Sequence, residues 1–269
     1  MRPMESMTEK NKHLTRFGFS FDRGGAHSSR TMMLEDLVSL FAYVDRPEAD
    51  KSDYLHAIDE ENCLGKRSGK PRLLTYRHLV DLYTLDHSKV LFRALLYFWN
   101  RDVEGQPLLA LSCVYARDAI FRASASFVLS VPEGARITRD SIEELIDAIE
   151  PGRFSAATLK STAQNINSTW TKSGHQQGRA IKIRTRAQPT AGSVAYALLL
   201  GYLSGVRGQS LFETEYIKLL DCSFDQAIGL AGEASRKGWI IFKHLGDVIE
   251  VVFPNIISAE EMEWLREQN

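Results

Sequence analysis

Apolar residues recur at helical spacing through the first half of the chain. Leu37, Leu40, Phe41 and Val44 are separated by steps of three and four, and similar steps continue to about residue 128. This spacing places apolar side chains on one face of an amphipathic helix. The pattern predicts five to seven helices with short polar connections, forming an all-α domain over residues 29–133. Residues 1–28 are expected to be a flexible N-terminal segment.

A break at Pro132 and Gly134 separates this region from a second pattern. A short helix is predicted over 141–149, and Ser155 caps a longer one with apolar residues at steps of four, three and four. The period then changes to two in 179–186 (RAIKIRTR), which is typical of a strand or hairpin arm. Helix, turn, helix and basic β arm is the order of a winged helix-turn-helix, and we assign it to residues 134–208.

A second unit of similar order follows over residues 209–269. Two helices precede an alternating stretch, 239–253, which predicts a hairpin turning at Gly246 and Asp247. The expected fold class is therefore mainly α, an N-terminal helical domain followed by winged-helix-like units with small β-hairpins.

Charge distinguishes the two winged-helix-like units. Residues 151–212 contain eight basic side chains and no acidic one, although 34 acids in 269 residues predict about eight in a window of that length. Residues 213–269 contain 5 basic and 11 acidic side chains, a net charge of −6. A basic patch of this kind is the electrostatic footprint of a polyanion-binding surface. The acidic unit is expected to pack on the chain or on a protein partner rather than on DNA.

The second helix of the basic unit is the predicted recognition helix, because amides and hydroxyls on its outward face can bond base edges or phosphates. In the arm, Lys182, Arg184 and Arg186 alternate with Ile181 and Ile183, so the basic side chains should face phosphates while the isoleucines face the core. The alternative is an amphipathic helix whose polar face only meets water. The predicted DNA-binding residues are Arg153, Lys160, Gln164, Asn165, Lys172, Arg179, Lys182, Arg184 and Arg186.

The sequence contains no recognisable motif for enzymatic or metal chemistry. Residues 65–71 (GKRSGKP) lack the first glycine of a phosphate loop and carry Pro71 where Ser or Thr should bind magnesium. Histidines and cysteines show no zinc spacing, and no GxSxG elbow occurs. We therefore expect a non-enzymatic protein with no metal and no cofactor. Three distant cysteines indicate a reducing, cytoplasmic setting, and the longest apolar run, 194–203, is about half of a membrane span.

Residues 155–174 (SAATLKSTAQNINSTWTKSG), with the basic arm and the helix that follow, resemble the BrxA family of BREX phage-defence systems. The clearest match covers about 155–205, and a weaker one lies at Gly24 and Gly25. The resemblance implies a DNA-binding accessory protein that works with other phage-defence proteins, and it carries a DNA-contact role onto Lys160, Gln164, Lys172 and Arg179. This chain is longer than the family pattern, and its C-terminal unit is an addition to it.

The sequence thus predicts a cytoplasmic, non-enzymatic component of a phage-defence assembly that binds double-stranded DNA and no membrane. Two alternatives stay open. One is an adaptor whose basic patch meets an acidic protein subunit. The other is a winged-helix transcriptional repressor, which would need a dimer and a palindromic site.

Overall fold

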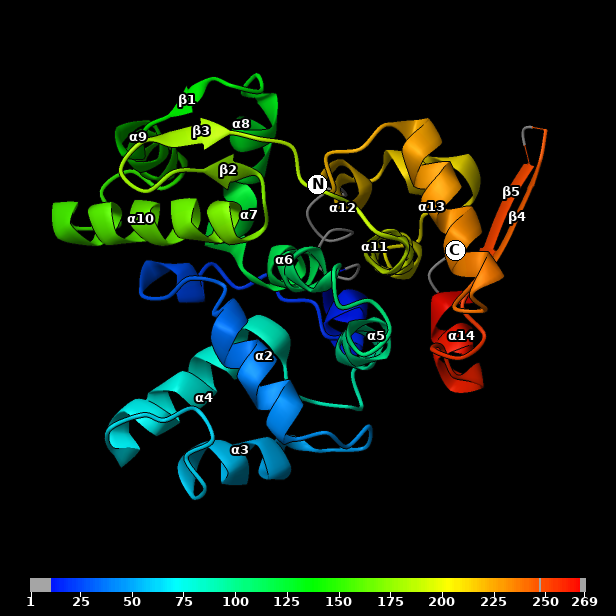
Figure 1. Ribbon diagram of the computed structural model, residues 1–269, viewed down its shortest axis with the longest axis horizontal. Coiled ribbons are helices and arrows are strands. Elements are labelled where there is room, and N and C mark those ends of the chain that lie inside the picture. The colour runs from blue at the N-terminus through cyan, green and yellow to red at the C-terminus, as the bar shows by residue number, and fades with distance from the viewer. Residues whose placement is uncertain (1–10, 247, 267–269) are drawn as a thin grey trace, which may run out of the picture.

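The computed structural model describes residues 11–246 and 248–266 (Figure 1). The N-terminal helices occupy the lower left of Figure 1, the basic winged unit the upper left and the C-terminal unit the right, with α5, α6 and α11 between them. This is a mainly helical fold with small antiparallel sheets, as predicted. Asp247, at the predicted hairpin turn, lies outside the described residues.

The N-terminal half contains the predicted helices. Asp50 illustrates how the sequence starts them, because its carboxylate accepts hydrogen bonds from the backbone N–H of Ser52 and Asp53 at a helix N-terminus. The elements are the 3-10 helix η1 (Ala26–Ser28), α2 (Leu34–Tyr43), α3 (Lys51–Asp59), α4 (Gly69–Tyr83), α5 (Val90–Trp99), α6 (Gln106–Arg117), α7 (Ala119–Ala123) and α8 (Ala125–Ser130).

The expectation of a flexible segment over 1–28 is wrong for residues 11–28. Residues 11–17 are helical, and Phe17, Phe19 and His27 are buried in the core. Aromatic side chains separated by polar residues can still anchor a segment when each has a cavity to fill. Residues 1–10 lie outside the described residues.

The basic unit has the element order of a winged helix. It consists of β1 (Arg136–Ile137), α9 (Arg139–Ile149), α10 (Ala156–Lys172), β2 (Gln176–Gln177) and β3 (Lys182–Arg184). The three strands form one antiparallel sheet in the order β1-β3-β2. Ser155 caps α10 with its hydroxyl, as the sequence predicted, and Thr138 caps α9 in the same way. Strand β1 was not predicted, and it makes β3 the central strand.

Helix α11 (Ala191–Leu203) is buried along its whole length and lies at the centre of the molecule. It packs against α5, α6, α12 and α13, so it belongs with the centre and the C-terminal unit rather than with the winged unit to which the 134–208 boundary assigned it. The C-terminal elements are η2 (Gly208–Glu213), α12 (Glu215–Lys218), α13 (Phe224–Arg236), β4 (Ile241–Leu245), β5 (Val248–Val252) and α14 (Ala259–Arg266). Within the described residues, every helix is too short or too polar to cross a bilayer.

The acidic C-terminal unit packs on the rest of the chain, as the charge distribution predicted. Arg93 of α5 forms a 2.7 Å ion pair with Glu261, whose side chain is almost fully buried. The ring of Trp239 lies edge-on to Phe98, with 6.4 Å between centroids. Since the buried apolar residues of all three regions form one continuous cluster, the predicted boundaries do not separate independent cores.

Candidate nucleic-acid interface

A buried polar network fixes the recognition helix α10 to the N-terminal region. His27 lies 2.9 Å from Asp118 through Nδ1 and 2.9 Å from the hydroxyl of Thr169 through Nε2. The same hydroxyl accepts a hydrogen bond from the backbone N–H of Met32. All of these polar groups are buried, so loss of one partner would leave the others unsatisfied. The network therefore sets which face of α10 is turned to solvent.

Asp118 is the charged member of that network. Burial alone would raise the pKa of its carboxyl group, but His27 and hydrogen bonds from the backbone N–H of Phe121 and His27 outweigh it, and the pKa lies below its usual value. Gly25 approaches this carboxylate closely, since a Cβ there would lie 2.2 Å from Oδ1. The Gly-Gly turn thus packs against a carboxylate.

The exposed face of α10 retains part of the predicted site. Lys160 and Gln164 are exposed, and Ser161 and Ser168 are half-buried beside them. Asn165 does not belong to this face, because its amide donates a 3.0 Å hydrogen bond to the carbonyl of His27. Its assignment as an outward, base-reading residue is therefore wrong.

The predicted orientation of the side chains in the basic arm is also wrong. Arg184 is buried, with 3% of its surface exposed, while Ile181, expected in the core, is 53% exposed. The guanidinium of Arg184 donates to the carbonyls of Val128, His175 and Thr185 and lies 2.9 Å from Asp221. Arg184 therefore lies on the interior face of β3, where these carbonyls and Asp221 surround its guanidinium.

Half of the eight basic side chains in 151–212 are paired with carboxylates that lie outside that window. Arg184 pairs with Asp221, as described above. Three more of the eight basic side chains form such ion pairs: Arg153 with Glu150, Lys172 with Glu35, and Arg186 with Glu133. Exposed pairs of this kind stay available to a stronger anion, but their net charge is close to zero. Among the predicted basic residues, Lys160, Arg179 and Lys182 have no carboxylate partner within the described part of the chain.

Lys182 and Arg179 lie at the tip of the wing. Nζ of Lys182 donates a 2.8 Å hydrogen bond to the carbonyl of Gly178, which closes the loop between β2 and β3. Partial burial lowers the pKa of Lys182. Arg179 is exposed. Both side chains border a groove between the wing, α10 and the start of α9.

This groove, which we call the wing groove, has a volume of about 500 Å³ and four basic side chains on its walls with no acidic one. Arg136 is exposed, whereas Arg139 pairs with Glu143 at 2.6 Å. The sequence prediction missed both arginines because they lie before the acid-free window. Arg136 lies in β1, which pairs with β3 of the arm, so a prediction of β1 would have placed this arginine beside the arm. The lining residues are Arg136, Ile137, Thr138, Arg139, Gln164, Asn167, Ser168, Arg179, Ala180, Ile181 and Lys182.

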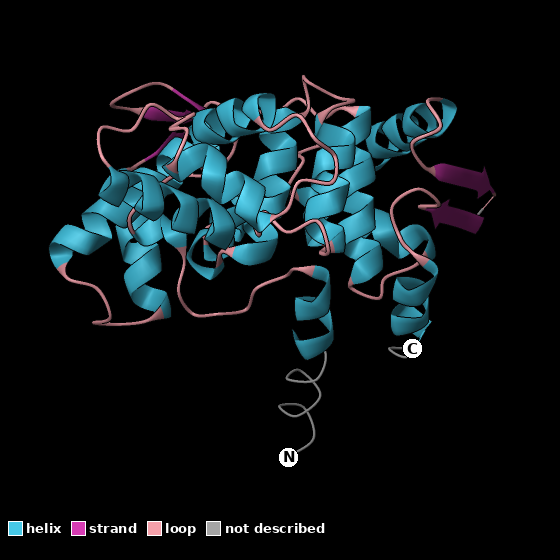
Figure 2. Ribbon diagram, turned by 90° about the horizontal axis from the view of Figure 1, so that it is seen from below, coloured by secondary structure: helices cyan, strands magenta, loops and turns pink. Residues whose placement is uncertain are grey.

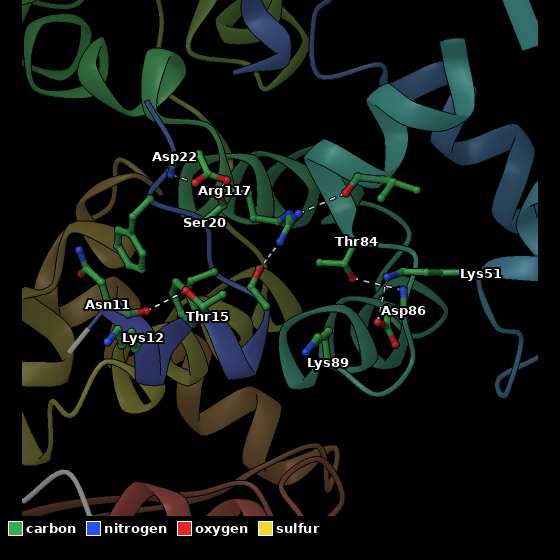
Figure 3. A pocket seen from close by; sticks show the side chains of 14 residues that line it. Asn11, Lys12, Thr15, Ser20, Asp22, Lys51, Thr84, Asp86, Lys89 and Arg117 are labelled. Carbon is green, nitrogen blue, oxygen red and sulfur yellow. Dashed lines mark hydrogen bonds and ion pairs between the residues drawn. The ribbon is translucent and has the colours of Figure 1, made fainter. Parts of the chain in front are cut away.

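A second hollow, of about 460 Å³, lies between the N-terminal segment and α4 (Figure 3). It is also lined by four basic side chains, Lys12, Lys51, Lys89 and Arg117, and two of these are engaged by other groups. Lys51 pairs with Asp86 at 3.1 Å, and the guanidinium of Arg117 donates to the backbone carbonyls of Gly18, Val80 and Asp81. Asp22 adds a further negative charge to its wall. The wing groove is therefore the better anion site of the two.

No group of three or more potential metal ligands occurs among the described residues. No protein-family model, no curated protein and no solved structure matches this chain significantly.

Proposed function

We propose that the protein binds double-stranded DNA through the wing groove and the exposed face of α10. One observation carries the proposal: the groove beside the recognition helix has four basic side chains and no carboxylate on its walls. Phosphate contacts of this kind supply most of the non-specific affinity of DNA-binding proteins. No enzymatic chemistry is included in the proposal.

The element order supports one way of docking. In a helix-turn-helix, the N-terminal part of the second helix contacts base edges in the major groove. Lys160 and Gln164 lie on that part of α10 and are exposed. Arg179, on the loop between β2 and β3, would then follow the neighbouring phosphates. This docking assigns base contacts to α10 and positioning contacts to the wing.

We place this activity in the cytoplasm, within a BREX-type phage-defence assembly. The assembly rests on the resemblance of residues 155–205 to the BrxA family. The compartment is supported by the three cysteines, all of which are free thiols, as expected in a reducing environment.

Arg179→Ala tests the phosphate contact. Loss of one such contact should weaken binding about equally for all sequences and lower the magnitude of the slope of log K against log salt by roughly 0.9. Anisotropy titrations with a random duplex at several salt concentrations measure both effects. Lys218→Ala is the matched control, because Lys218 is an exposed basic residue of the acidic unit that already pairs with Glu215.

Two results would count against DNA binding. The first is a wild-type protein with no duplex affinity at low salt. The second is an Arg179→Ala slope equal to those of the wild type and of Lys218→Ala. Absence of duplex affinity would favour the adaptor function, in which the same cations meet an acidic protein subunit.

The C-terminal hairpin provides separate support for the adaptor function. Strands β4 and β5 project from the helical body (Figure 2), and Leu245 and Val248 at the tip are 83% and 70% exposed. Together with Ile241 they form an apolar face around the Lys243–Glu250 ion pair. Apolar residues gathered on a projecting element are typical of protein contacts. A protein contact there is compatible with DNA on the distant winged unit.

A further inference from the structure

The floor of the wing groove contains an amide oxygen without a partner. Asn167 is only 5% exposed, and its side-chain oxygen accepts no hydrogen bond. The hydroxyl of Thr171 donates to the backbone carbonyl of Asn167 and not to this oxygen. Buried polar groups are almost always paired, and an unpaired one in a native structure calls for an explanation. A ligand that supplies a donor would satisfy this oxygen.

The rim of the wing groove, above Asn167, carries positively charged side chains. Arg136 and Arg179 are exposed and are not ion-paired within the described residues, and Lys182 donates only to a backbone carbonyl. The N-terminus of the eleven-residue helix α9 opens beside them at Thr138 and adds a favourable dipole for an anion. An anionic group is therefore expected at the rim.

We propose that the wing groove is a nucleotide pocket. Arg136, Arg179 and Lys182 hold the phosphate, and the amide of Asn167 pairs with the edge of the base. Ile137 and Ile181 supply apolar walls. An asparagine amide can donate and accept at once, which matches an adenine edge. The volume of about 500 Å³ lies within the range of roughly 300–1,000 Å³ typical of small-ligand pockets.

The depth of Asn167 separates this pocket from ordinary major-groove readout. Exposed side chains such as Gln164 reach the edge of a stacked base pair, but a recessed amide is reached only by a base that has left the stack. The nucleotide comes either from DNA, as an unstacked base, or from solution, as a free mononucleotide. The DNA source rests on the proposed function, whereas the free nucleotide does not.

Two probes distinguish these sources. The four deoxynucleoside 5′-monophosphates and inorganic phosphate are titrated into the full chain by calorimetry. In parallel, the chain is added to a duplex with a central 2-aminopurine, whose fluorescence rises when the base unstacks. The variants are Asn167→Leu and, as a surface change that leaves the core intact, Arg136→Ala. Ser161→Ala, on the α10 face outside the groove, is the control, and thermal unfolding checks the fold of each variant.

Each of the two possible sources of the nucleotide, solution and DNA, predicts a different positive result. Mononucleotide affinity that falls at least tenfold in Asn167→Leu and in Arg136→Ala, but not in Ser161→Ala, assigns a free nucleotide. A fluorescence rise on the duplex that Asn167→Leu abolishes, with duplex affinity within twofold of wild type, assigns a nucleotide of DNA. If Asn167→Leu is misfolded, Arg136→Ala decides instead: the tenfold criterion applies to the mononucleotides, and the fluorescence is compared at protein concentrations that saturate the duplex.

Three results overturn the pocket. The first is a protein that binds duplex DNA but gives no response with either probe, which leaves the proposed function standing. The second is affinity for inorganic phosphate equal to that for every mononucleotide, which removes base recognition. The third is absence of both duplex and nucleotide binding, which removes the proposed function as well. Mononucleotide binding without duplex binding keeps the pocket and removes only the proposed function.

Discussion

Replacing Arg184 with alanine is expected to lower the free energy of unfolding by about 3–5 kcal/mol, the range typical of removing one partner from a buried ion pair. The variant would remove three hydrogen bonds to backbone carbonyls and leave Asp221 without its counter-charge. Asp221 depends on this charge, because its Oδ2 accepts no hydrogen bond although it lies 2.9 Å from the guanidinium. The pair is thus held by charge rather than by a well-aligned hydrogen bond.

Urea unfolding of Arg184→Ala, Asp221→Ala and the double variant measures this coupling. The double variant should be less destabilised than the sum of the single ones, since neither charge is then left buried alone. Arg186→Ala is the control two residues along the arm, where both partners of the ion pair with Glu133 are well exposed and the expected change is within about 0.5 kcal/mol. Equal stabilities for Arg184→Ala and Arg186→Ala would contradict the structural role of Arg184.

Acidification from about pH 6.5 to pH 4 is expected to cost roughly 3 kcal/mol of stability through His175 alone. Its imidazole is buried, and burial lowers its pKa to about 4. The unfolded chain takes up this proton near pH 6.5, whereas the folded chain resists it until about pH 4. Stability from this group is therefore complete above pH 6.5, falls across the interval and is constant below pH 4.

The variant His175→Gln separates this effect from other titrations. Burial also lowers the pKa values of His78 and His87, so the wild-type pH curve contains their contributions as well. Unfolding of wild type and His175→Gln at pH 7.5, 6, 5 and 4 should show a difference that shrinks as the pH falls. Parallel curves for the two proteins would show that His175 does not resist protonation.

Sequence periodicity predicted the elements well because their apolar faces are continuous. The stripe of α10 ends at Trp170, which is fully buried and donates a hydrogen bond from its indole N–H to the hydroxyl of Ser124. The hairpin at β4 and β5 likewise follows from the alternation of its residues. Helix α11 is apolar on every side, so its spacing could not show which neighbours it would join.

The candidate site was predicted less well, because alternation fixes which residues share a face but not which face is buried. Arg184, expected at the surface, is buried, and Ile181, expected in the core, is exposed. Likewise, the partners of Lys172 and Arg184 lie 137 and 37 residues away in sequence, at Glu35 and Asp221. A charge count along the chain shows an excess of cations but cannot show which of them fold against distant carboxylates.

The central position of α11 also affects how the chain folds during synthesis. Its packing partners α12 and α13 are made after it, and residues 204–236 must leave the ribosome before they can cover it. At about 5–20 residues per second, the apolar surface of α11 stays uncovered for several seconds in each nascent chain. Transient binding by chaperones is therefore expected at this helix, and a stop codon before α13 would leave a product prone to aggregation rather than a smaller folded domain.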